Sequence, residues 1–338
     1  MSAAKTLFHP FEAGLLEVPS RNAPALFLGA EPGFRLPDGL AADIRCVQGF
    51  RPDFLALQRA GHAVKPQPEG ESHDLALVLL GRHRGRNELF VADAIERTRQ
   101  GGLVVVAGGK EDGAASLRLR VAKLLPLDGH APKHHGVVFW FRVGTGSAEA
   151  AIRLRADNPA VVVDGRFETA PGMFSHDRVD AASRLLARNL PADVAGDVAD
   201  FGAGWGFLAV SVAERFPAVR RVDLYEADFE SAAAARSNIA RLTPRIDSQT
   251  VWADLETEPP ARRYDLIVMN PPFHRGRAAE PAIGQAMIAA SHAALRPRGR
   301  LAMVANRQLP YEATLAARFS SVAEVARDTA FKVFLARR

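Results

Sequence analysis

The most specific group of chemically useful residues is Asn270-Pro271-Pro272-Phe273, which follows the apolar run Tyr264–Met269. Two prolines after a buried strand end its hydrogen-bond ladder and fix φ, so their carbonyl groups can face a cleft. Asn270 offers an amide oxygen and an NH₂ group, and Phe273 offers a ring face for stacking. This set suits a flat substrate with an exocyclic amine, held by Asn270 and the Pro271 carbonyl.

A second motif, Asp200-Phe201-Gly202-Ala203-Gly204-Trp205-Gly206, separates a β-type run from a helical pattern that ends near Phe216. Glycines let the backbone turn tightly and approach a ligand, while the N–H groups of the next helix face it. The spacing is G-x-G-x-G and not the G-x-G-x-x-G of dinucleotide-binding folds. A purely structural turn is the alternative interpretation.

Two acids follow the next predicted strands. Glu226 lies roughly 20 residues beyond Gly202, where a carboxylate can accept hydrogen bonds from both ribose hydroxyls of a nucleoside. A helix N-terminal acid is the alternative, and Asp228 can fill that place. Asp254 follows the third strand and can accept from an adenine amine, although a lone Asp there is also a common helix cap.

The second half of the chain alternates strands and helices. Strands are predicted at 194–201, 221–225, 249–252, 264–269 and 299–305, and helices at 179–190, 207–216, 229–242 and 281–295. This alternation predicts an α/β fold with a doubly wound, mostly parallel sheet, and runs 321–326 and 331–335 add an antiparallel edge. Ligands of such sheets bind at the carboxyl ends of the strands, where the motifs above lie.

The first half carries a fainter version of this pattern. Strands are predicted at 75–80, 103–107 and 137–143, and helices at 87–100 and 116–124, with no glycine-rich turn after the early strands. The two halves thus look duplicated. The small, polar stretch 144–151 is interpreted as a linker, so the predicted domains are 1–148 and 149–338.

Composition excludes several classes of protein. Of 338 residues 48% are apolar and the formal charge is +5, as in ordinary soluble globular proteins. The single cysteine, Cys46, excludes a disulfide framework and a Cys-rich zinc site, and no metal is expected. The sequence starts without a signal-peptide pattern and its apolar runs are strand-sized, so we expect a cytoplasmic protein without membrane contact. Basic clusters at 82–86, 274–277 and 296–300 are either solvated loops or contacts for a polyanion.

With these motifs in place, the second half resembles a class I S-adenosylmethionine-dependent methyltransferase. It is similar to the ribosomal RNA small subunit methyltransferase C family, which methylates N2 of a guanine in 16S rRNA. The marks of this resemblance are Pro171-Gly172-Met173-Phe174-Ser175, Asn270–His274, Val304-Ala305-Asn306 with Leu309-Pro310-Tyr311, and Phe331-Lys332-Val333. Trp205 departs from the pattern because it is bulkier than the residue expected in the glycine loop.

The resemblance implies two Rossmann-like methyltransferase domains, the first of them degenerate, with Lys133-His134-His135-Gly136 and Val138-Phe139-Trp140 as weaker marks. The first domain would dock RNA or support the fold. Its candidate phosphate contacts are Arg82, Arg84 and Arg86, with simple solubility as the alternative role. The implied partner is rRNA or the small ribosomal subunit, and we expect a monomer.

The resemblance also implies roles for single residues. The residues implied to bind S-adenosylmethionine are Phe174, Ser175, Asp200, Gly202, Gly204, Glu226, Asp254 and Asn270. The catalytic residues are Asn270, Pro271 and Phe273, and the residues next to the substrate are Pro272, His274 and Lys332. His274 is interpreted as structural or RNA-facing, because methylation of this amine needs no dedicated base.

Two other functions stay open from the sequence. Related enzymes act on 23S rRNA guanine, on adenine or on a protein glutamine amide; Phe273 favours guanine, because adenine and glutamine enzymes usually carry Tyr after the two prolines. A non-enzymatic RNA-binding or ribosome-assembly factor could keep a vestigial methyltransferase fold. The intact set Gly202, Gly204, Glu226 and Asn270 argues against that second alternative.

Overall fold

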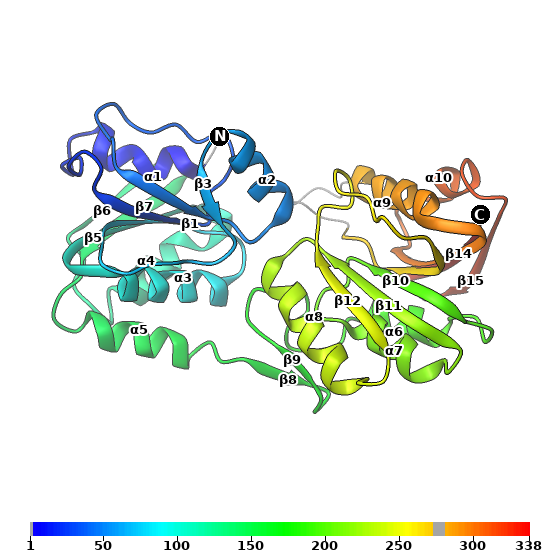
Figure 1. Cartoon of the computed structure of the whole chain (residues 1–338). Helices are drawn as coiled ribbons and strands as arrows, with labels where there is room; N and C mark the ends of the chain where they lie inside the picture. The colour runs from blue at the N-terminus through cyan, green and yellow to red at the C-terminus, as the bar shows by residue number, and fades with distance from the viewer. Residues whose placement is uncertain (1–2, 273–280) are drawn as a thin grey trace. The chain divides into compact units, whose positions relative to one another are not determined.

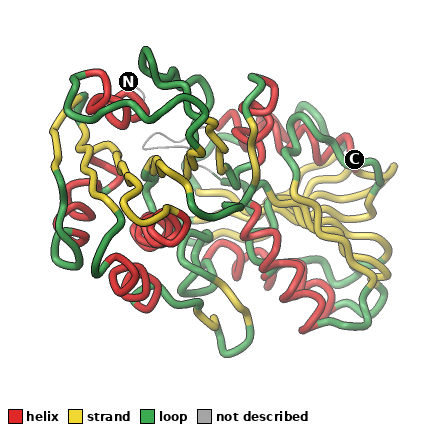
Figure 2. Tube along the Cα trace, turned by 60° about the vertical axis from the view of Figure 1, so that its left-hand side comes forward, coloured by secondary structure: helices red, strands yellow, loops and turns green. Residues whose placement is uncertain are grey.

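The computed structural model describes residues 3–272 and 281–338, and the chain divides into two compact units (Figure 1). The first unit holds Met1–Ala160 and Ala170–Gly172, and the second holds Val161–Thr169 and Met173–Arg338. Figure 2 shows the strands in yellow and the helices in red. No helix among the described residues is long and apolar enough to cross a membrane.

The first unit is built on a seven-stranded sheet. Its elements are α1 (Ala3–Glu12), β1 (Pro24–Leu28), β2 (Asp43–Val47), α2 (Arg51–Arg59), β3 (Ala63–Lys65), β4 (His73–Leu79), α3 (Arg84–Arg97), β5 (Thr98–Gly109), the 3₁₀ turn η1 (Lys110–Asp112), α4 (Ala114–Val121), β6 (Gly129–Lys133), β7 (Gly136–Arg142) and α5 (Ser147–Ala156). The strand order is β3-β2-β1-β4-β5-β7-β6, and only the pairings of β7 with β5 and β6 are antiparallel.

The second unit repeats this architecture after a short hairpin. Its elements are β8 (Val161–Val163), β9 (Phe167–Thr169), α6 (Ala181–Arg188), β10 (Gly196–Phe201), α7 (Phe207–Arg215), β11 (Val219–Glu226), α8 (Phe229–Leu242), β12 (Asp247–Trp252), β13 (Tyr264–Met269), α9 (Pro281–Ala294), β14 (Leu295–Asn306), α10 (Glu312–Ala316), β15 (Ser321–Arg327) and β16 (Phe331–Arg337). The order β12-β11-β10-β13-β14-β16-β15 is that of the first sheet, and β16 again runs antiparallel. The predicted doubly wound α/β fold and its duplication are confirmed.

Both faces of each sheet are covered, which explains why the central strands are continuously apolar. In the first unit, α1 and α2 pack on one face and α3, α4 and α5 on the other (Figure 1). In the second unit, α9 and α10 pack on the face that presents Phe201, Ile267 and Met303. Helices α6, α7 and α8 contact the sheet through β14, β10, β11 and β12.

The boundary between the units lies at residue 160 and not at 148 as predicted. The supposed linker 144–151 contains the start of α5, whose Ala150, Ala151 and Leu154 are buried in the first unit's core. Small residues allow α5 to lie close to α3. Their small size, which made the stretch look like a linker, is therefore a packing feature.

The first unit does contain a glycine turn after its first strand, contrary to the prediction. Gly29-Ala30-Glu31-Pro32-Gly33 follows β1, and the N–H groups of Gly29 and Ala30 both donate to Val47 O at 3.1 and 3.2 Å. In the second unit, Gly202 N and Ala203 N donate in the same way to Tyr225 O at 2.9 and 3.0 Å. The sequence analysis missed the turn because it did not predict β1.

Candidate active site

A pocket lies at the carboxyl ends of β10 and β13, where the sequence predicted a ligand site. It is lined by Phe174, Ser175, Asp180, Ser183, Gly202, Ala203, Gly204, Trp205, Phe207, Leu208 and Asn270. Five predicted residues (Phe174, Ser175, Gly202, Gly204 and Asn270) therefore line one cavity. A larger cavity, formed by residues 192–195 and 215–218, precedes β10 and β11 and lies at the opposite edge of the sheet, away from these residues.

The Asn270 side chain is held by the first turn of α6. Its Nδ2 atom donates to Asp180 Oδ2 at 3.0 Å and to Ser183 Oγ at 2.9 Å. Asp180 Oδ2 also accepts from Ser183 N at 2.9 Å and so caps α6. Because an amide NH₂ has two hydrogens, both are engaged, and Oδ1 is the atom of Asn270 left to accept a hydrogen bond.

The glycines of the loop serve two different purposes. Gly204 has φ +54°, and a Cβ atom there would meet nothing within 4 Å, so its backbone faces open space in the pocket. A Cβ atom on Gly206, which has φ +95°, would lie 3.3 Å from Ala235 Cα on α8. Gly206 is thus required by helix packing, whereas Gly204 leaves room for a ligand.

Glu226 supports the glycine loop from the end of β11. Its Oε2 accepts from Gly204 N at 2.7 Å and its Oε1 from Asp228 N at 2.8 Å. The Ala227 backbone also bonds this carboxylate, so of its four acceptor sites about one is left for a ligand hydroxyl. Burial, together with the charge of Asp228, raises the pKa of Glu226 to about 7. Asp228 caps α8 by accepting from Ser231 N at 3.0 Å, so the helix-cap role belongs to Asp228 and not to Glu226.

Asp200 lies fully buried beneath the same loop. Its Oδ2 accepts from Ala209 N at 3.0 Å, whereas Oδ1 has no hydrogen-bond partner among the described residues. Burial, with the nearby Glu226 charge, raises the pKa of Asp200 to about 7. An orphaned buried acceptor is costly, which makes this oxygen a candidate to accept a hydrogen bond from a ligand or to carry a proton.

Asp200 and Glu226 do not themselves line the pocket, and two further predicted residues, Asp254 and Lys332, do not line it either. Asp254 accepts from Glu256 N at 3.1 Å and from Thr257 Oγ1 at 2.7 Å, which is the turn-capping role given above as its alternative. Lys332 is almost fully buried on β16, and its Nζ lies 2.6 Å from Glu312 Oε1. In this structure Lys332 therefore has an acid on α10 as its partner, and its contact with the substrate stays a prediction.

The remaining predicted residues follow β13. Pro271 is buried and Pro272 is exposed. Phe273 and His274 lie outside the described residues, as do Arg275 and Arg277 of the second basic cluster. Among the described residues, no group of acids, histidines and cysteine could hold a metal ion.

Trp205, the unexpected residue of the loop, fastens the segment that carries Phe174. Its Nε1 donates to Phe174 O at 2.9 Å, and its ring packs against Phe167 and Phe207 with centroids 5.1 and 6.1 Å apart. Phe174 itself is 60% exposed on the rim of the pocket. The bulk of Trp205 is therefore used for packing, and the sequence analysis missed this contact.

Asn238 is a second residue that the sequence analysis missed. It is fully buried on α8, donates to Trp205 O and Glu168 O at 2.9 Å each, and accepts from Glu168 N at 2.9 Å. It thereby joins β9 to the glycine loop. An asparagine in an Ala-rich helix is the signal that could have pointed to it, because a buried amide needs partners.

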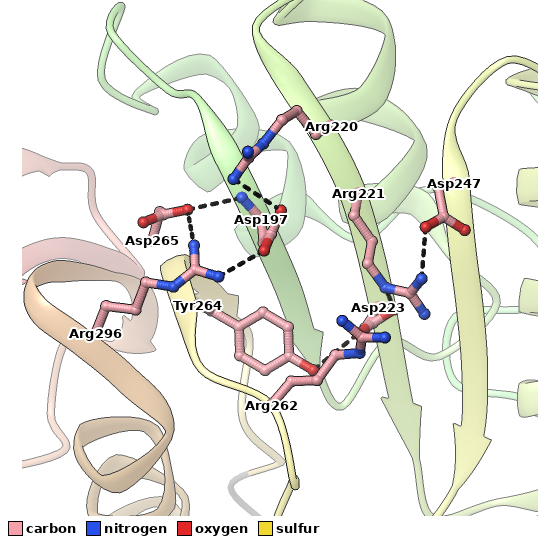
Figure 3. A network of polar contacts seen from close by, with 9 residues as sticks. All are labelled: Asp197, Arg220, Arg221, Asp223, Asp247, Arg262, Tyr264, Asp265 and Arg296. Carbon is pink, nitrogen blue, oxygen red and sulfur yellow. Dashed lines mark hydrogen bonds and ion pairs between the residues drawn. The ribbon is translucent and has the colours of Figure 1, made fainter.

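Two arginines of the third basic cluster, residues 296–300, form ion pairs at the amino ends of the strands. Arg296 bridges Asp197 and Asp265, with Nη2 2.6 Å from Asp197 Oδ2 (Figure 3). Arg300 contacts Asp193 at 2.8 Å. These two arginines hold the sheet together at the edge opposite to the pocket.

The first unit lacks the acid and the asparagine that the second unit has at the equivalent strand ends. Val47 pairs with the last residue of β1, as Tyr225 pairs with the last residue of β10. The next residue in the first unit, Gln48, therefore occupies the position that Glu226 has in the second unit. Gln48 Oε1 accepts from Phe50 N at 2.8 Å and its Nε2 donates to Ala30 O at 2.9 Å, which copies the Glu226 contacts with an amide. By the same register, buried Leu79 stands in place of Asn270.

Comparisons with known proteins agree with this architecture. The family model of the methyltransferase small domain matches residues 164–335. Ribosomal RNA small subunit methyltransferase C of Psychromonas ingrahamii is 33% identical over 165 residues, which are 48% of this chain and 46% of that protein. The protein of the same name from Pseudomonas aeruginosa is 28% identical over 270 residues, 78% of this chain and 79% of that one.

A solved structure shares the fold of nearly the whole chain. It is the T. thermophilus 16S rRNA N2 methyltransferase (RsmC) in complex with AdoMet and guanosine. Its TM-score is 0.78 at 24% identity, and the superposition covers 98% of this chain and 91% of that one. Both units therefore have counterparts in that structure.

Proposed function

Since this chain belongs to the methyltransferase small domain family, we propose that it transfers a methyl group from S-adenosylmethionine to the N2 amine of a guanine in 16S rRNA. The names of its relatives support this substrate. The observation that carries the proposal is the hydrogen bonding of Asn270. Both hydrogens of its NH₂ group are donated to Asp180 and Ser183, so its Oδ1 can accept a hydrogen bond from a substrate amine.

The residues present fit S-adenosylmethionine. Gly204 opens its backbone to the pocket, and Asp200 offers an acceptor without a partner. Glu226 keeps an acceptor site for a ribose hydroxyl, and exposed Phe174 with Ser175 borders the cavity. When bound, this donor supplies a methyl group on a positively charged sulfur. We assign no contact with the donor to Asp254, because its oxygens serve a turn.

Asn270 acts on the target amine in this proposal. Its Oδ1 and the Pro271 carbonyl accept the two N–H bonds of the guanine amine, which orients the nitrogen lone pair and stabilises the positive charge that grows there. Positioning suffices, because the alkylated amine is acidic and loses its proton without a dedicated base. A guanine in a duplex cannot enter such a pocket, so the target base is unpaired or flipped.

The first unit supports the fold or docks RNA in this proposal. Gln48 and Leu79 lack the acceptor pattern of Glu226 and Asn270, so it binds no methyl donor. Arg84 remains a candidate phosphate contact because its side chain is 82% exposed, although its Nε also lies 2.9 Å from Glu88. We place the reaction in the cytoplasm, on rRNA or the small subunit, with a monomeric enzyme.

The test is substitution of Asn270 followed by mapping of the methylated nucleotide. Asn270→Ala removes one acceptor of a developing charge and should lower kcat by about 100-fold or more, with S-adenosylmethionine affinity nearly unchanged by calorimetry. Asn189→Ala is the matched control, because the Asn189 side chain donates to Leu185 O at the end of α6 and lines no part of the pocket.

Mass spectrometry of rRNA from cells with and without the protein identifies the target. Loss of an N2-methylguanine in 16S rRNA is the expected result. Loss of a methyl mark in 23S rRNA or on a glutamine would favour the related enzymes. Wild-type turnover by Asn270→Ala would refute the assigned role, and absence of donor binding would favour a non-enzymatic assembly factor.

A further inference from the structure

We propose that Asp180 is a positioning residue for methyl transfer: its carboxylate, with Ser183, sets which end of the Asn270 amide faces the target amine. This inference rests on the proposed function for its effect on turnover. Its structural part, the locked orientation of one amide, stands on the described contacts alone.

The three side chains come from two separate elements. Asp180 and Ser183 begin α6, whereas Asn270 follows β13, 90 residues later than Asp180. Asp180 Oδ2 accepts from Ser183 N at 2.9 Å and from Asn270 Nδ2 at 3.0 Å, and Ser183 Oγ accepts the other amide hydrogen at 2.9 Å. All three side chains line the pocket.

A carboxylate can impose an orientation that other caps cannot. An ionised Asp only accepts hydrogen bonds, so a flipped Asn270 would set its Oδ1 against Asp180 Oδ2 and lose a charge-assisted bond. In the observed orientation Nδ2 faces α6, and Oδ1 is left for the guanine amine. In the flipped orientation an NH₂ group would face that amine, and two donors cannot bond each other.

Capping alone does not explain the residue or its contacts. Ser, Thr and Asn cap helices about as well as Asp, so the cap of α6 needs an acceptor atom but no carboxylate. Asp180 reaches beyond its own helix to a residue at a strand end, and Ser183 does so beside it. Both contacts meet on the one side chain proposed to bind the substrate.

Three variants separate positioning from capping. Asp180→Ser keeps a cap for α6 but is too short to reach Asn270, and Asp180→Asn keeps an acceptor of the same size without the charge. Ser183→Ala removes only the second acceptor. Asp328→Ser is the matched control. Like Asp180, Asp328 accepts hydrogen bonds from backbone N–H groups, those of Ala330 at 2.8 Å and Phe331 at 2.6 Å, but it lines no part of the pocket.

The kinetic readout is the split between kcat and KM on rRNA. We expect Asp180→Ser to lower kcat about tenfold or more with KM and donor affinity nearly unchanged. Asp180→Asn should restore only part of the loss, because its amide can also donate and therefore permits the flipped Asn270. Ser183→Ala should cost less than Asp180→Ser, and the control should match the wild type. An unchanged kcat in Asp180→Ser would overturn the proposal.

The second readout needs neither donor nor RNA. In protein labelled with ¹⁵N-asparagine, the Asn270 side-chain NH₂ signals are assigned by their loss in Asn270→Ala, and their hydrogen exchange is measured. We expect slow exchange in the wild type and in the Asp328→Ser control, and at least about tenfold faster exchange in Asp180→Ser. Equal exchange in Asp180→Ser and wild type would refute the locked amide. If the wild type methylates no guanine, the proposed function fails, and the exchange rates alone decide whether Asp180 holds Asn270.

Discussion

Binding of S-adenosylmethionine should weaken as the pH falls from 8 to 6, because Glu226 accepts ribose hydroxyls best as a carboxylate. The pKa of this group is raised to about 7 by burial. With that value, about nine in ten molecules carry the ionised form at pH 8 and about one in ten at pH 6. If only the ionised form binds well, the affinity falls about tenfold over this range, which is about 1.3 kcal/mol.

Calorimetric titration at several pH values measures this dependence, with Glu226→Gln as the comparison. The variant should bind more weakly at pH 8 and lose most of the pH dependence, because its amide does not titrate there. Asp200 also has a pKa raised to about 7, so a slope that remains in Glu226→Gln is assigned to Asp200. An affinity that is equal at pH 6 and pH 8 would refute the role of an ionised Glu226.

The same shifts affect the stability of the unliganded protein in the opposite sense. Both groups bind protons more tightly in the folded chain than in the unfolded one, since their folded pKa values lie above the usual 3.8 and 4.5. Their contribution to stability is therefore full below about pH 4 and is lost as the pH rises through about 7. Saturating donor should cancel this loss, because the folded form with donor bound stays ionised over the range in which the unfolded chain is also ionised.

Three further results are expected. Gly204 and Gly33 both have a positive φ and nothing within 4 Å of an added Cβ, so changing either to Ala should cost about 1 kcal/mol of unfolding free energy. Only Gly204→Ala should lower donor affinity, by more than about tenfold in calorimetry. Equal affinities in the two variants would contradict the assigned pocket. Asn238→Ala should destabilise the second unit by about 2–4 kcal/mol in denaturant unfolding, because it leaves backbone groups of Glu168 and Trp205 without partners. A loss under about 1 kcal/mol would show that the hydrogen bonds of Asn238 do not stabilise this unit as proposed. The full chain should bind one S-adenosylmethionine, and a stoichiometry of two would overturn the degenerate character of the first unit.

The sequence predicted most of the second sheet but little of the first unit's beginning. Helix α8 and strand β13 were predicted to the residue, because an Ala-rich segment after a capping Asp and a short apolar run before two prolines leave few alternatives. Strands β1, β2 and β3 were not predicted. They are at most five residues long, and β2 (DIRCV) mixes charged and apolar residues, so their patterns resemble loops.

Within the site, strand ends could be predicted and partners could not. The rule that ligands bind at carboxyl strand ends placed Asn270 near the glycine loop before any coordinates. Asp180 and Ser183 lie some 90 residues earlier, and only the packing of α6 brings them to Asn270. Lys332 is a second case: a family motif predicted its contact with the substrate, and no sequence pattern indicated the salt bridge that the fold forms between it and Glu312.

The duplicated turn shows which features of the loop indicate catalysis. Gly29 and Gly202 both follow the first strand of their sheets, have φ values of +71° and +75°, and donate to the neighbouring strand in the same way. The strand-to-loop turn therefore requires a glycine at this position in both units, although only the second unit has the acid and the asparagine of the site. What differs is the side chain at the next strand end, an amide in Gln48 and a carboxylate in Glu226. A glycine turn alone therefore indicates the fold, and the acid and the asparagine beside it carry the inference of a methyltransferase.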